Sequence, residues 1–366
     1  MLQVPKRDAA VRKDSLNPGF TRITPSARIK ISRHGGRAKC LQRLIRLEMP
    51  VPKTLALSFG AVHDIAAGHL PDTAAMMAAI GNGAIVSVRP SSEDPDWGGP
   101  GAILNIGMND ARHAALSEKI GEEAASALYL RFVQSYSVHV ARLDPDAFVV
   151  IDTNPVKALR QVLDAYATES DQAFLQDPAV QLAEVLRSMA RAWEGTTARL
   201  LRQAKGAPAD AGLGLVVQEM AMGIGVGECG SGVIRFIDRN TGEKRVTGRY
   251  LSQSQGRDAL ASGNPALYLT RDPRGASMQD KCPECFAALL ETGTVCRTQL
   301  REEMEIEFTV ESGGLHILDA VRVSRSARAA VRVAVEMARD EVISRADAVL
   351  RVEPRALTEL LHYQVD

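Results

Sequence analysis

Apolar residues recur along the chain at two different spacings, which predict strands in some stretches and helices in others. The β-branched run 84–89 (AIVSVR) predicts a buried strand, and an apolar run beginning at Leu215 predicts a second one. A helix that ends at the prolines of MPVP (49–52) is predicted from four residues at helical spacing: Leu41, Leu44, Ile45 and Leu47. A strand and turn over 249–256, and helices over 283–304 and 327–346, are predicted in the same way.

Residues 109–206 have long helical patterns and few strand signals. Two helices are expected to begin at Asn154-Pro155 and Asp177-Pro178, because each proline follows a side chain that can cap a helix. One apolar stripe in the second helix is assigned to the core: Leu182, Val185, Leu186, Met189 and Trp193. The region therefore predicts an inserted helical subdomain.

A β-hairpin is predicted from the period-two alternation of 305–310, a turn at Glu311-Ser-Gly-Gly and a return strand from Leu315. If the turn has three loop residues, Glu307 pairs with Asp319, with their Cβ atoms roughly 5 Å apart on one face. Such carboxylates repel each other, and a divalent cation such as Mg²⁺ would remove the repulsion. The alternative is that Glu307 pairs with an arginine and Asp319 ends its strand in solvent. His316 is expected to alternate away from Asp319 and to be structural.

A glycine-dense stretch follows the apolar run from Leu215 and precedes a strand predicted at 233–238. Glycines without a Cβ let successive N–H groups approach an anion, and five occur here: Gly223, Gly225, Gly227, Gly230 and Gly232. Gly225-x-Gly227-x-x-Gly230 matches the dinucleotide fingerprint formally, but that motif must open a helix, so we reject that interpretation. A phosphate cradle and a hairpin loop without a ligand both remain open.

Two arginines are placed where an anion could bind. Arg37 follows Gly35-Gly36 at a predicted helix start, which suits an anion, although a solvated arginine after a turn fits the same residues. Arg89 is predicted at the end of its strand, and the loop 90–101 after it would be a lid or a structural turn.

Composition limits the possible partners. The 366 residues carry 44 basic and 44 acidic side chains, so the protein has no net positive charge to attract nucleic acid. Only 4% of the residues are aromatic, which argues against surfaces that stack on single-stranded bases. Without an apolar run of membrane-spanning length or a secretory signal, we expect a cytoplasmic protein and no membrane partner. The five scattered cysteines are expected to be reduced, and Cys282-Pro-Glu-Cys285 lacks a second ligand pair for a metal.

Taken in order, these features resemble the nucleotide-binding region of pyruvate, phosphate dikinase and, more distantly, of phosphoenolpyruvate synthase. The resemblance covers about residues 28–366. It rests on these blocks: Gly35-Gly36-Arg37 before MPVP; Ser87-Val-Arg89 with ILNIGMND (103–110); Gln218-Glu-Met220; Ser231-Gly-Val with Thr241-Gly-Glu243; Glu305-Ile-Glu307-Phe-Thr; and DAVLRVEP (347–354) with Leu360-Leu-His362.

The resemblance implies an α+β, ATP-grasp-like fold in which two lobes clasp ATP. The expected segments are a flexible basic arm (1–28), a first lobe (29–108), the helical insertion (109–206), a second lobe with the glycine-rich loop and the metal hairpin (207–340), and a C-terminal helical segment (341–366).

Residue roles also follow from the resemblance. Arg37 stands at the family's phosphate-binding lysine and Arg89 at the arginine of Ser-Val-Arg, so both are candidate catalytic residues together with Glu307. The candidate metal ligands for Mg²⁺ are Glu307 and Asp319. The candidate nucleotide-binding residues are Gln218, Glu219 and Met220 at the adenosine hinge, and Gly225, Gly227, Gly230, Ser231 and Gly232 over the phosphates.

This chain departs from the family's pattern at position 321, where Val321 replaces an arginine that contacts the phosphates; Arg322 or Arg325 could substitute for it. The family's swivelling phosphohistidine domain has no counterpart in the sequence. The expected function is therefore an ATP-dependent phosphotransferase whose acceptor is a histidine on a separate carrier protein or a small molecule. A catalytically impaired ATP-binding regulator or scaffold and, less favoured, an interaction module with an empty cleft are the alternatives.

Overall fold

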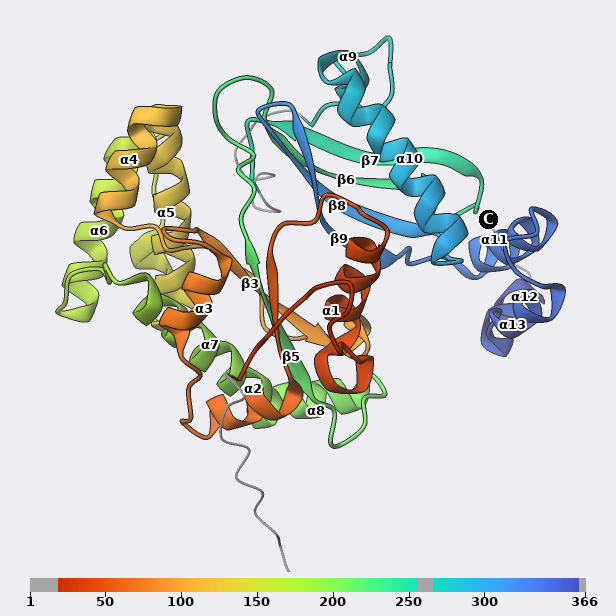
Figure 1. The fold of residues 1–366 in the computed structure, drawn as a ribbon, viewed down its shortest axis with the longest axis horizontal. Helices are drawn as coiled ribbons and strands as arrows, with labels where there is room; N and C mark the ends of the chain where they lie inside the picture. Colours follow the sequence, from red (N-terminus) through yellow and green to blue (C-terminus); the bar gives the residue numbers. More distant parts are fainter. Residues whose placement is uncertain (1–18, 256–265, 362–366) are drawn as a thin grey trace, which may run out of the picture.

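The computed structural model describes residues 19–255 and 266–361. Residues 1–18 of the predicted arm, Gly256 and His362 lie outside this part of the chain. The described residues form two antiparallel sheets with helices around them (Figure 1). The predicted α+β class is confirmed.

The first sheet has the strand order β1-β2-β5-β3-β4. Its strands are β1 (Thr21–Arg22), β2 (Thr54–Leu57), β5 (Leu213–Glu219), β3 (Val86–Ser92) and β4 (Ile103–Ile106). The sheet differs from expectation in two ways. Strand β5, which we expected in the second lobe, pairs with β2 and β3 at the centre of this sheet. Residues 19–28 of the expected arm contain β1 and the buried Ile23, because apolar side chains there reach the core.

The second sheet has the order β7-β6-β8-β9. Its strands are β7 (Lys244–Ser252), β6 (Gly230–Ile237), β8 (Met304–Glu311) and β9 (Gly314–Arg322). Helix α10 (Pro283–Gln299) lies across this sheet, and the short α9 (Met278–Lys281) precedes it (Figure 1). Helix α10 ends five residues before the predicted Met304, which instead begins β8.

Helix α1 (Ile31–Arg46) joins the two sheets into one structure. It contacts β3 and β5 of the first sheet and β9 of the second. Its Leu41 and Leu44 share a core with Ile306 and Phe308 of β8. Two further helices, α2 (Phe59–Ala66) and α3 (Thr73–Ile80), complete the first lobe.

Residues 109–206 contain helices and no strand. The helices are α4 (Asp110–Ile120), α5 (Glu122–His139), α6 (Pro155–Ser170), α7 (Pro178–Glu194) and α8 (Thr196–Ala204), with a short 3₁₀ turn at Pro145–Phe148. A second 3₁₀ turn, Pro95–Trp97, lies outside this region, between β3 and β4. Asn154 and Asp177 cap α6 and α7 as predicted, and all five residues of the predicted stripe on α7 are buried. Helix α7 packs on α2 and α3, so the insertion is anchored to the first lobe.

The C-terminal region consists of α11 (Ala327–Arg339), α12 (Arg345–Leu350) and α13 (Pro354–Leu361). The single helix predicted over 327–346 is wrong. The chain turns after Arg339, and Ser344 then starts a new helix through a capping box with Asp347.

Strand β3 is longer than the predicted 84–89 and continues through Pro90 to Ser92. Proline is tolerated there because β4 pairs with β3 only at Val86 and Val88, so Pro90 faces a neighbouring strand on one side alone. Arg89 therefore lies within the strand and not at its end.

The position of α1 is fixed by a break at Gly35. Gly35 has φ 84° and ψ 172°, and a Cβ there would lie 1.8 Å from the carbonyl oxygen of Ser91. The Ser91 hydroxyl bridges the break: its Oγ accepts from Ala38 N (3.1 Å) and donates to the carbonyl oxygen of His34 (2.7 Å). This contact places Arg37 beside β3.

We expect Gly35→Ala to lower the free energy of unfolding by roughly 2–4 kcal/mol, since it adds left-handed strain and a clash with strand β3. Urea denaturation measures the change. Gly68→Ala is the matched control, because Gly68 also has a positive φ (103°) but a Cβ there meets nothing within 4 Å. Equal losses in the two variants would contradict the close contact with Ser91.

Candidate functional site

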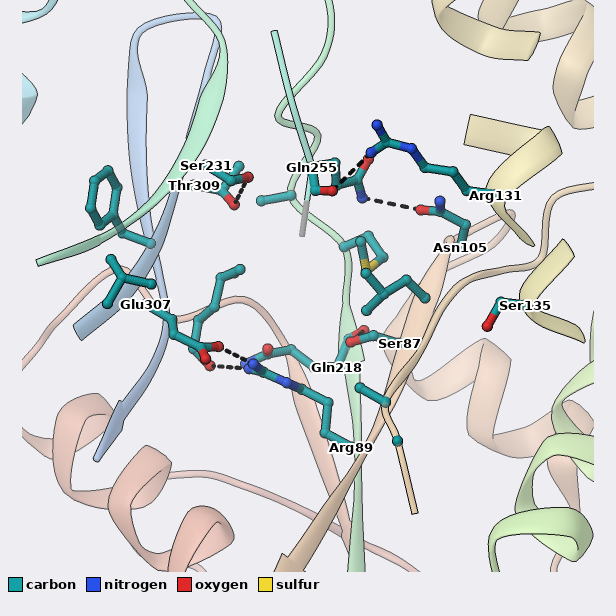
Figure 2. A pocket seen from close by; sticks show the side chains of 18 of the residues that line it. Ser87, Arg89, Asn105, Arg131, Ser135, Gln218, Ser231, Gln255, Glu307 and Thr309 are labelled. Atoms are coloured by element: carbon teal, nitrogen blue, oxygen red, sulfur yellow. Dashed lines mark hydrogen bonds and ion pairs between the residues drawn. The ribbon is translucent and has the colours of Figure 1, made fainter. Parts of the chain in front are cut away.

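A cavity of about 490 Å³ lies between the two sheets and helix α5. Figure 2 shows its walls, with Arg89 and Glu307 meeting on one side and Arg131 and Asn105 on another. The cavity includes these predicted site residues: Arg37, Arg89, Gln218, Glu219, Met220, Ser231, Gly232 and Glu307. Asp319, Gly225, Gly227 and Gly230 do not line it.

Two arginine–carboxylate pairs connect the lobes beside this cavity. Arg89 on β3 is ion-paired with Glu307 on β8, as the dashed lines in Figure 2 show. Arg37 on α1 donates from Nε to Oδ2 of Asp319 on β9 at 2.7 Å. Each pair joins an element of the first lobe to a strand of the second, so the charges also hold the lobes in register.

Each of these two guanidinium groups also donates a hydrogen bond to a backbone carbonyl oxygen. Arg37 also donates to the carbonyl oxygen of Pro90, and Arg89 donates to that of Leu318 at 3.2 Å. Burial disfavours the charge on Arg89, but the nearby carboxylates of Glu307 and Asp319 outweigh that effect and raise its pKa above the ordinary value. Arg89 is therefore held as a cation.

The predicted pairing of Glu307 with Asp319 is confirmed, but the predicted turn is wrong. Glu311 pairs with Gly314, so the turn has two loop residues, and a bulge at Leu318 supplies the missing residue. The bulge turns the Leu318 carbonyl toward Arg89. It also puts His316, which pairs with Thr309, on the same face as Asp319, so the expectation that His316 points away is wrong.

The two carboxylates do not repel, because each has an arginine as its counter-ion. Asp319 is only 1% exposed, and its second oxygen accepts from Ala320 N at 2.9 Å. Asp319 therefore does not fit a metal in this arrangement, and it is not a solvent-exposed strand end either. Glu307 lines the cavity and fits a cation shared with a ligand. Across residues 19–255 and 266–361, no three His, Cys, Asp or Glu side chains form a metal site.

Packing explains several residues of the glycine-dense stretch. A Cβ on Gly232 would lie 2.5 Å from the Phe308 ring, and one on Gly230 would lie 2.5 Å from the Tyr250 hydroxyl. Gly225 donates its N–H to Gln253 Oε1 at 3.0 Å. Gly225, Gly227 and Gly230 do not line the cavity in this structure, and Gly313 N of the β8–β9 turn donates to Glu228 O and ties the stretch to that turn. Their expected role over the phosphates stays a prediction.

The predicted hinge lies where β5 leaves the first sheet. Gln218 is buried and donates to Thr54 Oγ1 at 3.1 Å, while Met220 N donates to the carbonyl oxygen of Ile85 at 2.9 Å. The first hydrogen bond fixes the Gln218 side chain and the second fixes the backbone at Met220, where the chain crosses to the second lobe beside the cavity.

Several cavity residues were missed from the sequence. Arg131, Ser135 and His139 line it from one face of α5, and their spacing of four residues within an apolar helix was the available signal. Gln255 connects Arg131 of this wall to Asn105 (Figure 2). Its backbone carbonyl oxygen accepts from Arg131 at 2.8 Å, and its side-chain amide donates to Asn105 Oδ1 at 3.1 Å. No sequence signal pointed to Gln255.

Neither candidate substitute for the arginine missing at Val321 reaches the cavity. Arg322 and Arg325 both form ion pairs with Glu302. Val321 itself pairs with Glu305, which is bonded to Arg235. The prediction that Arg322 or Arg325 could supply the charge is wrong, because neither lines the cavity.

All five cysteines belong to the described part of the chain, and none forms a disulfide. Burial raises the pKa of Cys285 to about 12 and that of Cys296 to about 11. These thiols are therefore protonated near neutral pH and make poor nucleophiles.

Comparison with curated proteins finds relatives across most of the chain. Pyruvate, phosphate dikinase of Rhizobium meliloti is 30% identical over 306 residues, that of Rickettsia prowazekii 29% over 303, and that of Clostridium symbiosum 28% over 297. The chain is a divergent relative of one region of pyruvate, phosphate dikinase. The matches cover 76–78% of this chain and 33–34% of each relative. The chain thus spans about a third of the length of the dikinases, and no protein-family model matches it.

The contribution of the Arg37–Asp319 pair to stability can be measured. We expect Asp319→Asn to lower the free energy of unfolding by about 2–4 kcal/mol, because it leaves the Arg37 charge without its buried partner. Chemical denaturation measures the loss. Glu243→Gln removes the exposed partner of Arg332 and should cost no more than about 1 kcal/mol. A loss from Asp319→Asn no larger than this control would show that the pair does not hold the lobes.

Proposed function

We propose that the cavity binds ATP together with Mg²⁺ and that the chain is a phosphotransferase. The observation that carries this proposal is the position of Arg37, Arg89 and Glu307 on a cavity that also meets the hinge Gln218–Met220. A volume of about 490 Å³ falls within the usual range for small-molecule sites, roughly 300–1,000 Å³. The relationship to pyruvate, phosphate dikinase supports the same choice.

Binding would proceed by an exchange of partners. A guanidinium binds phosphate oxygens in the same forked geometry as it binds a carboxylate. Phosphates entering the cavity can therefore replace Glu307 beside Arg89 and Asp319 beside Arg37. Glu307, once released, would hold Mg²⁺, which when bound neutralises phosphate charge. The hinge residues would hold the nucleoside.

The chemical step would be displacement at phosphorus. A nitrogen lone pair of the acceptor histidine, or a nucleophile on a small molecule, forms the new bond as the bond from phosphorus to the bridging oxygen breaks. That oxygen leaves with the electron pair. Arg37 and Arg89 would stabilise the charge on the transferred group, which is the main catalytic contribution in such reactions. The acceptor would be a separate phosphohistidine carrier or a metabolite.

One observation favours a second candidate, an ATP-binding regulator that has lost catalysis. Val321 leaves no arginine on β9 that faces the cavity, since Arg322 is held by Glu302. Such a protein would bind ATP without turnover. A cytoplasmic location, and the absence of nucleic-acid partners, stay predictions. In the described residues, the helices are too short or too polar to cross a membrane.

Calorimetric titration with ATP, in Mg²⁺ and again in EDTA, tests the proposal. We expect micromolar, Mg²⁺-dependent binding, and a roughly 10- to 100-fold loss in the double variant Arg89→Gln, Glu307→Gln. Removing both charges leaves neither partner unpaired, so the fold should survive, which circular dichroism checks.

Glu243→Gln serves as the control for a surface charge. Absence of ATP binding by the native protein in both buffers would overturn the proposal. Binding without phosphoryl transfer to any carrier or small-molecule acceptor would instead support the regulator.

A further inference from the structure

Four arginines line the cavity, and Arg249 differs from the other three. Arg37 is paired with Asp319, Arg89 with Glu307, and Arg131 donates to the carbonyl oxygen of Gln255. Among residues 19–255 and 266–361, no hydrogen bond or ion pair involves the Arg249 guanidinium, although its side chain is partly buried. A partly desolvated cation without a counter-charge is unfavourable.

The register of the second sheet fixes where Arg249 stands. It pairs with Val233 on β6, Val233 pairs with Glu307 on β8, and Glu307 pairs with Asp319 on β9. Residues opposite one another across a sheet share a face. Arg249 therefore stands in one row with the two carboxylates, separated from Glu307 by one strand, which is about 10 Å between backbones.

The acidic groups on this cavity do not neutralise Arg249. Glu307 is engaged by Arg89, and Glu219, the other lining carboxylate, forms no ion pair with Arg249 within the described part of the chain. Ser231 and Thr309, the nearest hydroxyls of the same face on β6 and β8, hydrogen-bond to each other at 3.0 Å. The row thus ends in a guanidinium that has no acceptor among the residues that the structure describes.

We infer that Arg249 is a phosphate-binding residue of this cavity. A guanidinium fork matches a phosphate group. Among the described residues, Arg249 is the lining arginine that is not committed to a protein partner. An incoming phosphate can bind Arg249 without displacing a carboxylate, whereas Arg37 and Arg89 must first exchange partners. This inference rests on the proposed function, since the phosphate belongs to the proposed nucleotide.

Titration of the full chain with adenosine, AMP, ADP and ATP in Mg²⁺ tests the inference. Arg249→Gln should weaken ATP binding by about 10-fold or more, the loss expected for a hydrogen bond to a charged group. Adenosine binding should stay unchanged. The first member of the series to lose affinity identifies the phosphate that Arg249 contacts. Arg249→Lys should recover part of the affinity, because it restores the charge without the fork.

Arg245→Gln is the matched control. Arg245 lies exposed on the same strand, and it does not line the cavity. The Arg245→Gln variant loses the same charge as Arg249→Gln, and its affinity for ATP should stay within about twofold of that of the native protein. If the native protein binds ATP and Arg249→Gln binds it equally well, or loses adenosine to the same extent, the inference is wrong while the proposed function stands. Absence of ATP binding in the native protein would remove both.

Discussion

The pairing of two arginines with two carboxylates across the lobes is the constraint on which the site depends. Charges this far from water must be compensated, and Arg89 with Glu307, each about one-seventh exposed, compensate one another. Arg37 and Asp319 do the same directly across the hairpin, where Asp319 pairs with Glu307. In each of these two pairs, the charges therefore neutralise one another at this end of the site. A phosphate ligand has to compete with protein carboxylates for the two arginines. Its affinity therefore depends on how much more stable the arginine–phosphate pairs are than the arginine–carboxylate pairs that they replace.

Two local backbone features bring these charges together. Gly35 lets α1 approach β3 closely enough for Ser91 to bridge the broken helix, which places Arg37. The bulge at Leu318 aligns Asp319 with Glu307 and presents a carbonyl to Arg89. Both features act by setting the register between the first lobe and the hairpin of the second.

The sequence predicted the α+β class, the capped helices of the insertion and the pairing of Glu307 with Asp319. That pairing followed from an assumed turn of three loop residues, whereas the turn has two and a bulge at Leu318 supplies the extra residue. The two differences cancel in the register, so the pairing was correct although the turn and the bulge were not predicted. For the glycine-dense stretch, the sequence left a phosphate cradle open as an explanation. The structure shows that Gly230 and Gly232 are required by contacts with the Tyr250 and Phe308 side chains, which come later in the chain. Arg249 and Gln255 were missed for the same reason, since only the fold brings β7 to α5.

The central claim is that the arginines exchange carboxylate for phosphate when a nucleotide binds. The most direct measurement is a crystal structure with Mg²⁺ and a non-hydrolysable ATP analogue. The account predicts phosphate oxygens within hydrogen-bonding distance of the Arg37 and Arg89 guanidinium groups, with Glu307 turned from Arg89 toward the metal. A bound nucleotide with both arginines still on Asp319 and Glu307 would contradict it.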